Sequence, residues 1–124
     1  MKTILVVDDD QGIREILSSI IEKRTEHKVL VAEDGEAALE IARKNKIDLF
    51  ILDMLMPRIG GIALFNDLQR SFRTKDTPVI FISGTLKDEE FQREGVEMGA
   101  VDYITKPIDM SLFIDKINEV IGSK

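Results

Sequence analysis

The chain has 124 residues, of which 44% are hydrophobic and 32% are charged, a balance that suits one globular domain with a single core. A formal net charge of −6 argues against direct binding of a nucleic-acid backbone, and the lack of cysteine excludes disulfides and thiolate metal sites. No apolar run approaches the roughly 20 residues of a membrane span and no signal peptide is evident, so we expect a cytoplasmic protein with no membrane partner.

Five short apolar runs recur along the chain, with the length and β-branched content that are typical of buried strands. They are Ile4–Val7, Val29–Ala32, Leu49–Leu52, Val79–Ile82 and Val101–Ile104. Apolar residues at helical spacing lie between and after them, at Ile13, Ile16, Leu17, Ile20 and Ile21, at Leu64, Leu68 and Phe72, and at Phe113, Ile117 and Ile121. A further helix is expected near Lys87–Met98. The alternation of strands and helices predicts an α/β fold with a parallel sheet between two layers of helices.

The helix starts carry their own signals. Asp10 is the expected N-cap of the first helix, Asp34-Gly35 marks the start of the second, and Gly60-Gly61 marks the start of the third. Because Gly60 has no side chain, we expect the third helix to begin without a side-chain cap. His27 lies in the charged sequence RTEHK, and we therefore expect it to be exposed to solvent.

In a doubly wound sheet the carboxyl ends of the strands form the binding edge, so the residues that follow the strands are site candidates. The candidates are Asp8, Asp9 and Asp10 after the first strand, Asp53 at the end of the third, Ser83 after the fourth and Lys106 after the fifth. The second strand is followed only by Glu33 and Asp34, which favours an edge position for it.

Clustered carboxylates repel one another, and burial raises their pKa values, so this arrangement calls for a compensating cation. Mg²⁺ is the oxygen-seeking ion that such a set of residues favours. The cation would screen Asp53 and orient a phosphoryl group, whose other oxygens would meet Lys106 and Ser83. An aspartate carboxylate is then a competent nucleophile toward phosphorus. Taken singly, each residue has an ordinary explanation, such as a solvated turn, a capped strand end or a surface lysine.

The segments ILVVDDD, ILDMLMP, VIFISGT and DYITKP together resemble the response-regulator receiver domain of bacterial two-component signalling, and the resemblance spans the whole chain. It implies a flavodoxin-like doubly wound (βα)5 fold with strand order 2-1-3-4-5, and a single receiver domain over residues 1–124 with no effector domain in this chain. It also implies that Asp53 is the phosphoacceptor and that Asp9 binds Mg²⁺ directly. Asp8 would bind the ion through water, and the backbone carbonyl of Leu55 would be a further ligand.

The same resemblance implies a phosphorylation-dependent switch. Ser83 is the switch hydroxyl, Tyr103 is the switch aromatic, and Lys106 is the lysine before proline, with a cis Lys106–Pro107 peptide. The implied phosphoryl donor is a sensor histidine kinase or a histidine phosphotransfer protein, and the output is a downstream protein target or a separate effector domain. Such a chain is a signalling phosphoacceptor, which assists its own phosphorylation and autodephosphorylation, and is not an enzyme in the usual sense. Phosphorylation would change the surface of the fourth helix, the fifth strand and the fifth helix.

Three alternatives remain. A Mg²⁺-dependent phosphatase of the haloacid-dehalogenase type would use Asp8 to Asp10 as an Asp-x-Asp motif with Ser83 and Lys106. The chain has no room for the cap domain of such an enzyme, and this interpretation gives Asp53 no role. An unphosphorylated pseudo-receiver scaffold is disfavoured because every chemical residue is present. Dinucleotide binding is the weakest, since no G-x-G-x-x-G follows the first strand.

Overall fold

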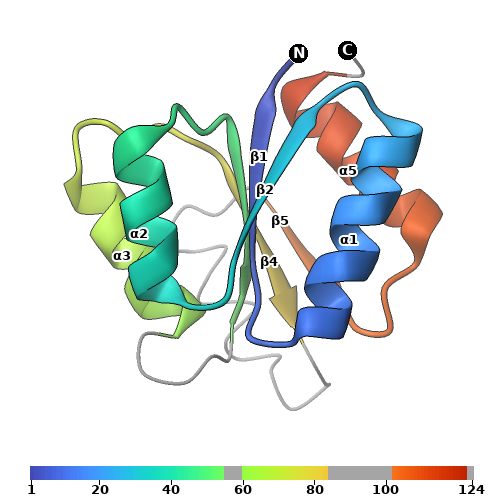
Figure 1. The fold of residues 1–124 in the computed structure, drawn as a ribbon, viewed down its shortest axis with the longest axis horizontal. Coiled ribbons are helices and arrows are strands. Elements are labelled where there is room, and N and C mark those ends of the chain that lie inside the picture. Colours follow the sequence, from blue (N-terminus) through green and yellow to red (C-terminus); the bar gives the residue numbers. More distant parts are fainter. Residues whose placement is uncertain (55–59, 84–101, 123–124) are drawn as a thin grey trace.

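The computed structural model describes residues 1–54, 60–83 and 102–122, apart from the side chains of Ile62 and Ser83. Its sheet has five parallel strands in the order β2-β1-β3-β4-β5. The strands are β1 (Thr3–Val7), β2 (Lys28–Ala32), β3 (Leu49–Asp53), β4 (Val79–Ser83) and β5 (Asp102–Thr105). The predicted fold class and strand order are confirmed, and β2 lies at an edge as expected (Figure 1).

The helices of the described residues cover both faces of the sheet. They are α1 (Gln11–Arg24), α2 (Gly35–Lys44), α3 (Gly61–Arg70) and α5 (Met110–Ile121). Helices α1 and α5 lie on one face, and α2 and α3 lie on the other (Figure 1). The helix expected near Lys87–Met98 falls outside the described residues. Among the helices that are described, none combines the length and the apolar character that crossing a membrane requires.

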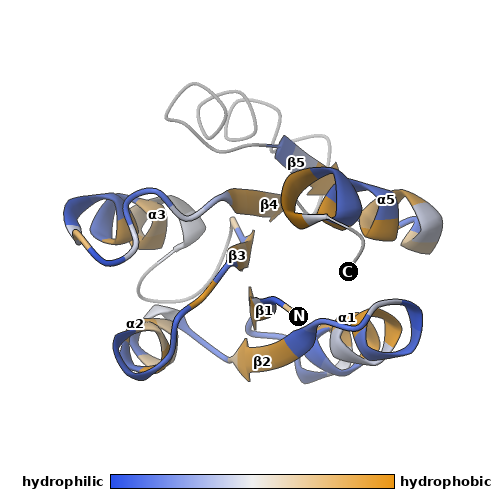
Figure 2. Cartoon of the chain, turned by 90° about the horizontal axis from the view of Figure 1, so that it is seen from above, coloured by the Kyte–Doolittle hydropathy of each residue, from blue (hydrophilic) through white to orange (hydrophobic). Residues whose placement is uncertain are grey.

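The central strands are buried on both faces, which explains their unbroken apolar sequences. Successive side chains of a strand point to opposite faces. In β1, Leu5 and Val7 pack with residues of α2 and α3, whereas Ile4 and Val6 pack with residues of α1 and α5. The result is two hydrophobic clusters, one on each face of the sheet; β4 is largely orange in Figure 2, whereas the edge strand β5 is largely blue.

The helix caps follow the sequence signals. Asp10 caps α1 by accepting a hydrogen bond from the backbone N–H of Ile13. Asp34 caps α2 in the same way, accepting from Ala37. Helix α3 begins after Gly60 with no side-chain cap, as expected.

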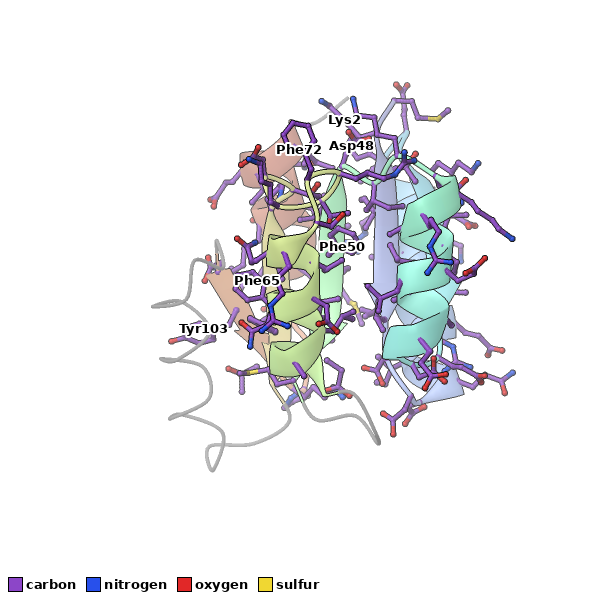
Figure 3. All side chains as sticks on the ribbon, turned by 90° about the vertical axis from the view of Figure 1, so that its left-hand side faces the viewer. Lys2, Asp48, Phe50, Phe65, Phe72 and Tyr103 are labelled. Atoms are coloured by element: carbon purple, nitrogen blue, oxygen red, sulfur yellow. The ribbon has the colours of Figure 1, made fainter. Side chains whose placement is uncertain are left out.

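Phe72 does not continue the apolar stripe of α3, and the expectation from its spacing is wrong. The helix ends at Arg70, and the backbone N–H of Ser71 closes its last turn on the Leu68 carbonyl. The chain then turns toward β4, which leaves Phe72 88% exposed on the surface (Figure 3). The ammonium of Lys75 lies 4.8 Å from the centre of its ring.

His27 is buried, which contradicts the exposed position expected from its charged neighbours; only 3% of the residue is exposed. Its Nδ1 accepts a hydrogen bond from the backbone N–H of Lys2 at 3.2 Å. The ring proton therefore resides on Nε2, which donates to the Gly122 carbonyl at 3.1 Å. The imidazole thus ties the start of β1 to the end of α5, two segments that lie at the same end of the molecule (Figure 1).

Replacing this ring should destabilise the fold. His27→Ala removes two hydrogen bonds and leaves a cavity, so we expect a loss of about 2 kcal/mol in the free energy of unfolding. Urea unfolding followed by circular dichroism measures it, with the neighbouring exposed residue as the matched control in Glu26→Ala. Equal midpoints for the two variants would show that the ring contributes no net stability.

Candidate functional site

Asp8 follows β1 directly and is fully buried, with 0% of the residue exposed. Its backbone N–H donates to the Ala32 carbonyl of β2, and its Oδ1 accepts from the backbone N–H of Asp10 at 2.9 Å. Its backbone carbonyl accepts a hydrogen bond from Nη1 of Arg14 at 2.8 Å. Within the described part of the chain, Oδ2 accepts no hydrogen bond. One carboxylate oxygen is therefore fixed by the turn, and the other points toward the site.

Asp53 is the last residue of β3, and 4% of it is exposed. Strand pairing continues past it, because the backbone N–H of Met54 donates to the Ile82 carbonyl of β4. The start of α3 closes against this strand end. The backbone N–H of Gly61 donates to the Met54 carbonyl, and a Cβ at Gly61 would lie 2.2 Å from the carbonyl oxygen of Asp53. Only glycine fits so close to the backbone that carries Asp53.

The ends of β1 and β3 bring three carboxylates together. Oxygens of Asp8, Asp9 and Asp53 all lie within 4.8 Å of one another, and Asp9 is the exposed member of the three. Lys106, just after β5, places its Nζ 3.4 Å from Oδ2 of Asp8 and 3.9 Å from Oδ2 of Asp53. The Lys106–Pro107 peptide is cis, as the sequence resemblance implied. Four predicted site residues from three strand ends thus form one cluster.

The remaining predicted site residues are Ser83, Tyr103 and Leu55. Ser83 ends β4 and pairs in register with Thr105, at the same edge of the sheet as Asp53. Tyr103 lies on β5 in register with Phe81, and its side chain points outward with 37% of the residue exposed (Figure 3). Leu55, expected to supply a backbone ligand, lies outside the described residues.

The described residues of this cluster carry more negative than positive charge. Burial raises the pKa of the Asp8 carboxyl above its usual range; the Asp10 N–H and the Lys106 ammonium lower it in part, and the charge on Asp9 raises it. Three carboxylates face one ammonium among the described residues near the cluster. Oxygen donors in this number, one of them a buried Oδ2 that accepts no hydrogen bond from the described residues, fit a hard divalent cation such as Mg²⁺.

Two residues of the site were missed in the sequence. The signal for Arg14 was a cation in the first turn of α1, where the helix dipole disfavours positive charge. The signal for Gly61 was present in Gly60-Gly61, but a glycine pair is equally expected at a helix start. Its close approach to Asp53 depends on the way α3 meets β3 in space.

The raised pKa of Asp8 predicts a stability effect of known sign. Because the folded protein binds this proton more tightly than the unfolded chain, stability falls as pH rises from about 4 through the raised pKa. Asp8→Asn keeps an acceptor for the Asp10 N–H and removes the charge. In the presence of EDTA at pH 7 we expect this variant to be more stable than the wild type by about 0.5–2 kcal/mol.

Urea melts at several pH values test this effect, with the exposed Asp115→Asn as a control that should lie within about 0.5 kcal/mol of the wild type. The advantage of Asp8→Asn should vanish below about pH 4, where the carboxyl is protonated in both states. An Asp8→Asn variant less stable than the wild type at pH 7 would contradict the burial argument.

The sequence matches the family model described as the response regulator receiver domain over residues 4–118. Protein PilH of Pseudomonas aeruginosa is 36% identical over 123 residues, which cover 98% of this chain and 99% of that protein. The phosphate regulon transcriptional regulatory protein PhoB of the same organism is 37% identical, over 97% of this chain and 52% of PhoB. A probable cyclic di-GMP phosphodiesterase of Vibrio cholerae is 34% identical, over 98% of this chain but 27% of its own length. The chain therefore spans about a quarter to a half of some curated relatives and nearly all of another.

Solved structures agree with the sequence comparisons. The chemotaxis protein CheY4 of Vibrio cholerae superposes with a TM-score of 0.89 at 28% identity, covering 98% of this chain and 99% of that one. The receiver domain of the Francisella response regulator 1452 gives a TM-score of 0.86 at 32% identity, covering 97% and 96%. The family model covers most of the chain, and PilH matches it almost end to end. The chain belongs to the response regulator receiver domain family.

Proposed function

We propose that this receiver domain is a phosphorylation-dependent signalling switch in which Asp53 accepts the phosphoryl group. The observation that carries the proposal is the position of Asp53 at the end of a central strand, with Asp8 and Asp9 within 4.8 Å and the ammonium of Lys106 at 3.9 Å. A phosphoryl group on Asp53 would lie close to the positive charge of Lys106. Electrostatic stabilisation of this kind is the main contribution a protein makes to phosphoryl transfer.

The contacts and complete burial of Asp8 argue against it as the nucleophile. Asp8 is fully buried, and its Oδ1 is held by the backbone N–H of Asp10. A phosphatase of the haloacid-dehalogenase type would need the first of its two aspartates to attack the substrate. Here that aspartate is Asp8, which is fully buried and therefore not accessible to a substrate. Asp53 lies at the strand end, where an incoming phosphoryl donor would approach the edge of the sheet.

In the proposed site Asp8, Asp9 and Asp53, with the backbone carbonyl of Leu55, would hold one Mg²⁺. The ion, when bound, supplies positive charge to the phosphoryl oxygens and to the crowded carboxylates. Lys106 would contact another phosphoryl oxygen, and Ser83 would donate a hydrogen bond to the phosphorylated state. The fit of three clustered carboxylates to a hard cation supports this assignment.

The proposed donor is a phosphohistidine on a sensor histidine kinase or a histidine phosphotransfer protein. The P–N bond of the phosphohistidine breaks as a bond forms between phosphorus and an Asp53 oxygen, and the imidazole leaves with the electron pair. The new phosphoryl group would draw Ser83 inward, and Tyr103 would turn from its exposed position toward the space left behind. This population shift would change the surface of β5, α5 and the helix expected near Lys87–Met98. A downstream protein or a separate effector domain would bind the changed surface.

Removing the nucleophile should abolish phosphorylation. With acetyl phosphate as donor and millimolar Mg²⁺, we expect the wild type to acquire one phosphoryl group by intact-mass spectrometry and Asp53→Asn to acquire none. Asp48→Asn is the matched control, because Asp48 immediately precedes the same strand at its opposite end, and its side chain accepts a hydrogen bond from Thr3 that asparagine can also accept.

Two results would contradict the assignment. Phosphorylation retained by Asp53→Asn, or mapped to Asp8, would favour the phosphatase alternative. Multiple turnovers of a simple phosphate monoester by the wild type would do the same.

A further inference from the structure

Arg14 connects helix α1 to the backbone of the acidic turn. Its guanidinium Nη1 donates to the carbonyl of Asp8 at 2.8 Å, and its own backbone N–H donates to the carbonyl of Asp10 at 3.1 Å. The carbonyl of Asp8 belongs to the peptide unit that joins Asp8 to Asp9. The second bond is the ordinary backbone bond of a helix, which any residue here would make, so only the guanidinium contact with the Asp8 carbonyl is particular to Arg14.

The position of Arg14 is unusual for a helix. The first turn of α1 contains no acidic residue, and Arg14 puts a cation there, although helix dipoles favour negative charge at this end. Lys23 and Arg24, by contrast, lie in the last turn, where the dipole favours cations. Such a departure from a local rule is expected where a residue serves a site.

The orientation of the Asp9 carboxylate depends on this backbone more than the orientations of the Asp8 and Asp53 carboxylates do. Its carboxylate is exposed and accepts no hydrogen bond from another residue in the described segments. Asp8 has an Oδ1 that is held within the turn, and Asp53 is fixed at the end of a sheet strand. The direction in which Asp9 points relative to the other two carboxylates is therefore set by the peptide that Arg14 holds.

We propose that Arg14 is a positioning residue that orients the Asp8–Asp9 peptide so that the carboxylate of Asp9 converges with those of Asp8 and Asp53 on a divalent cation. This inference rests on the proposed function, since it assumes that the three carboxylates bind Mg²⁺. It assigns to α1 a role in the affinity of the site for metal in addition to its packing on the sheet.

The direction in which the Mg²⁺ affinity changes when Arg14 is replaced distinguishes a positioning role from an effect of its charge alone. If Arg14 acted only through its positive charge, its removal would lower the repulsion of Mg²⁺ and tighten binding. If it positions Asp9, its removal weakens binding. Loss of a group that orients a metal ligand typically lowers metal affinity by about 10- to 100-fold.

Isothermal titration of the wild type, Arg14→Met and Arg24→Met with Mg²⁺ is the test. Arg24→Met removes the same charge from the exposed far end of α1. We expect about a tenfold increase in the Kd of Arg14→Met and little change in Arg24→Met. The Mg²⁺ concentration that half-saturates labelling by acetyl phosphate should rise by the same factor, with the rate at saturating Mg²⁺ close to that of the wild type. An unchanged or lower Kd for Arg14→Met, or a rate lost at saturating Mg²⁺, would overturn the inference.

Arg14→Lys serves if Arg14→Met does not fold. Lysine keeps the charge, but its shorter side chain does not carry a donor to the position of Nη1, so its Kd should exceed that of the wild type, and an equal Kd would show that the hydrogen bond to the Asp8 carbonyl does not position Asp9. A wild type that binds no Mg²⁺, or a labelled Asp53→Asn, would refute the proposed function itself. A wild type that passes both tests beside an Arg14→Met variant that matches Arg24→Met would refute only the role of Arg14.

Discussion

The carboxylates of Asp8 and Asp53 are buried at the ends of two neighbouring parallel strands, and most other features of the site follow from the need to hold negative charge there. Strands β1 and β3 are paired over four residues, so their carboxyl ends, and the two side chains, are forced into one place. Lys106 approaches both carboxylates from the end of β5. Asp9 adds a third negative charge close by, and the pKa of Asp8 rises as a consequence of its burial. In the proposed function, such a site is maintained at some expense of stability because binding of Mg²⁺ would need the charge.

The hydrophobic layers make such a site possible. Two apolar clusters on opposite faces of the sheet hold β1 and β3 by side chains that are almost completely buried. The strand ends are therefore held in place, and they fix the positions at which the following turns begin. Backbone contacts complete the arrangement: Gly61 closes α3 against Asp53, and Arg14 ties α1 to Asp8. Groups held on rigid elements keep their geometry for catalysis and binding better than groups on free loops.

Much of this architecture could be predicted from the sequence. A strand that is buried on both faces has an unbroken apolar sequence, and a carboxylate directly after such a run marks the end of the strand. The runs around Leu5 and Phe50 predicted the central strands, and parallel pairing then predicted that Asp8 and Asp53 would meet. The errors arose where contacts come from distant segments. His27 is flanked by charged residues, yet it is buried because Lys2 and Gly122 lie beside it in the folded chain. Phe72 had the correct spacing for a helix that ends two residues earlier.

The central claim is that the acidic pocket is incomplete without a divalent cation, and the dependence of stability on Mg²⁺ tests it most directly. The free energy of unfolding is measured by urea titration in EDTA and in increasing MgCl₂, with NaCl added to keep the ionic strength constant. A ligand bound only by the folded state at ten times its Kd stabilises that state by about 1.4 kcal/mol. We predict that the wild type gains stability with the logarithm of Mg²⁺ concentration, while Asp9→Ala is at least as stable in EDTA and gains much less. A wild type that does not respond to Mg²⁺, or an Asp9→Ala variant with the same response, would contradict the account.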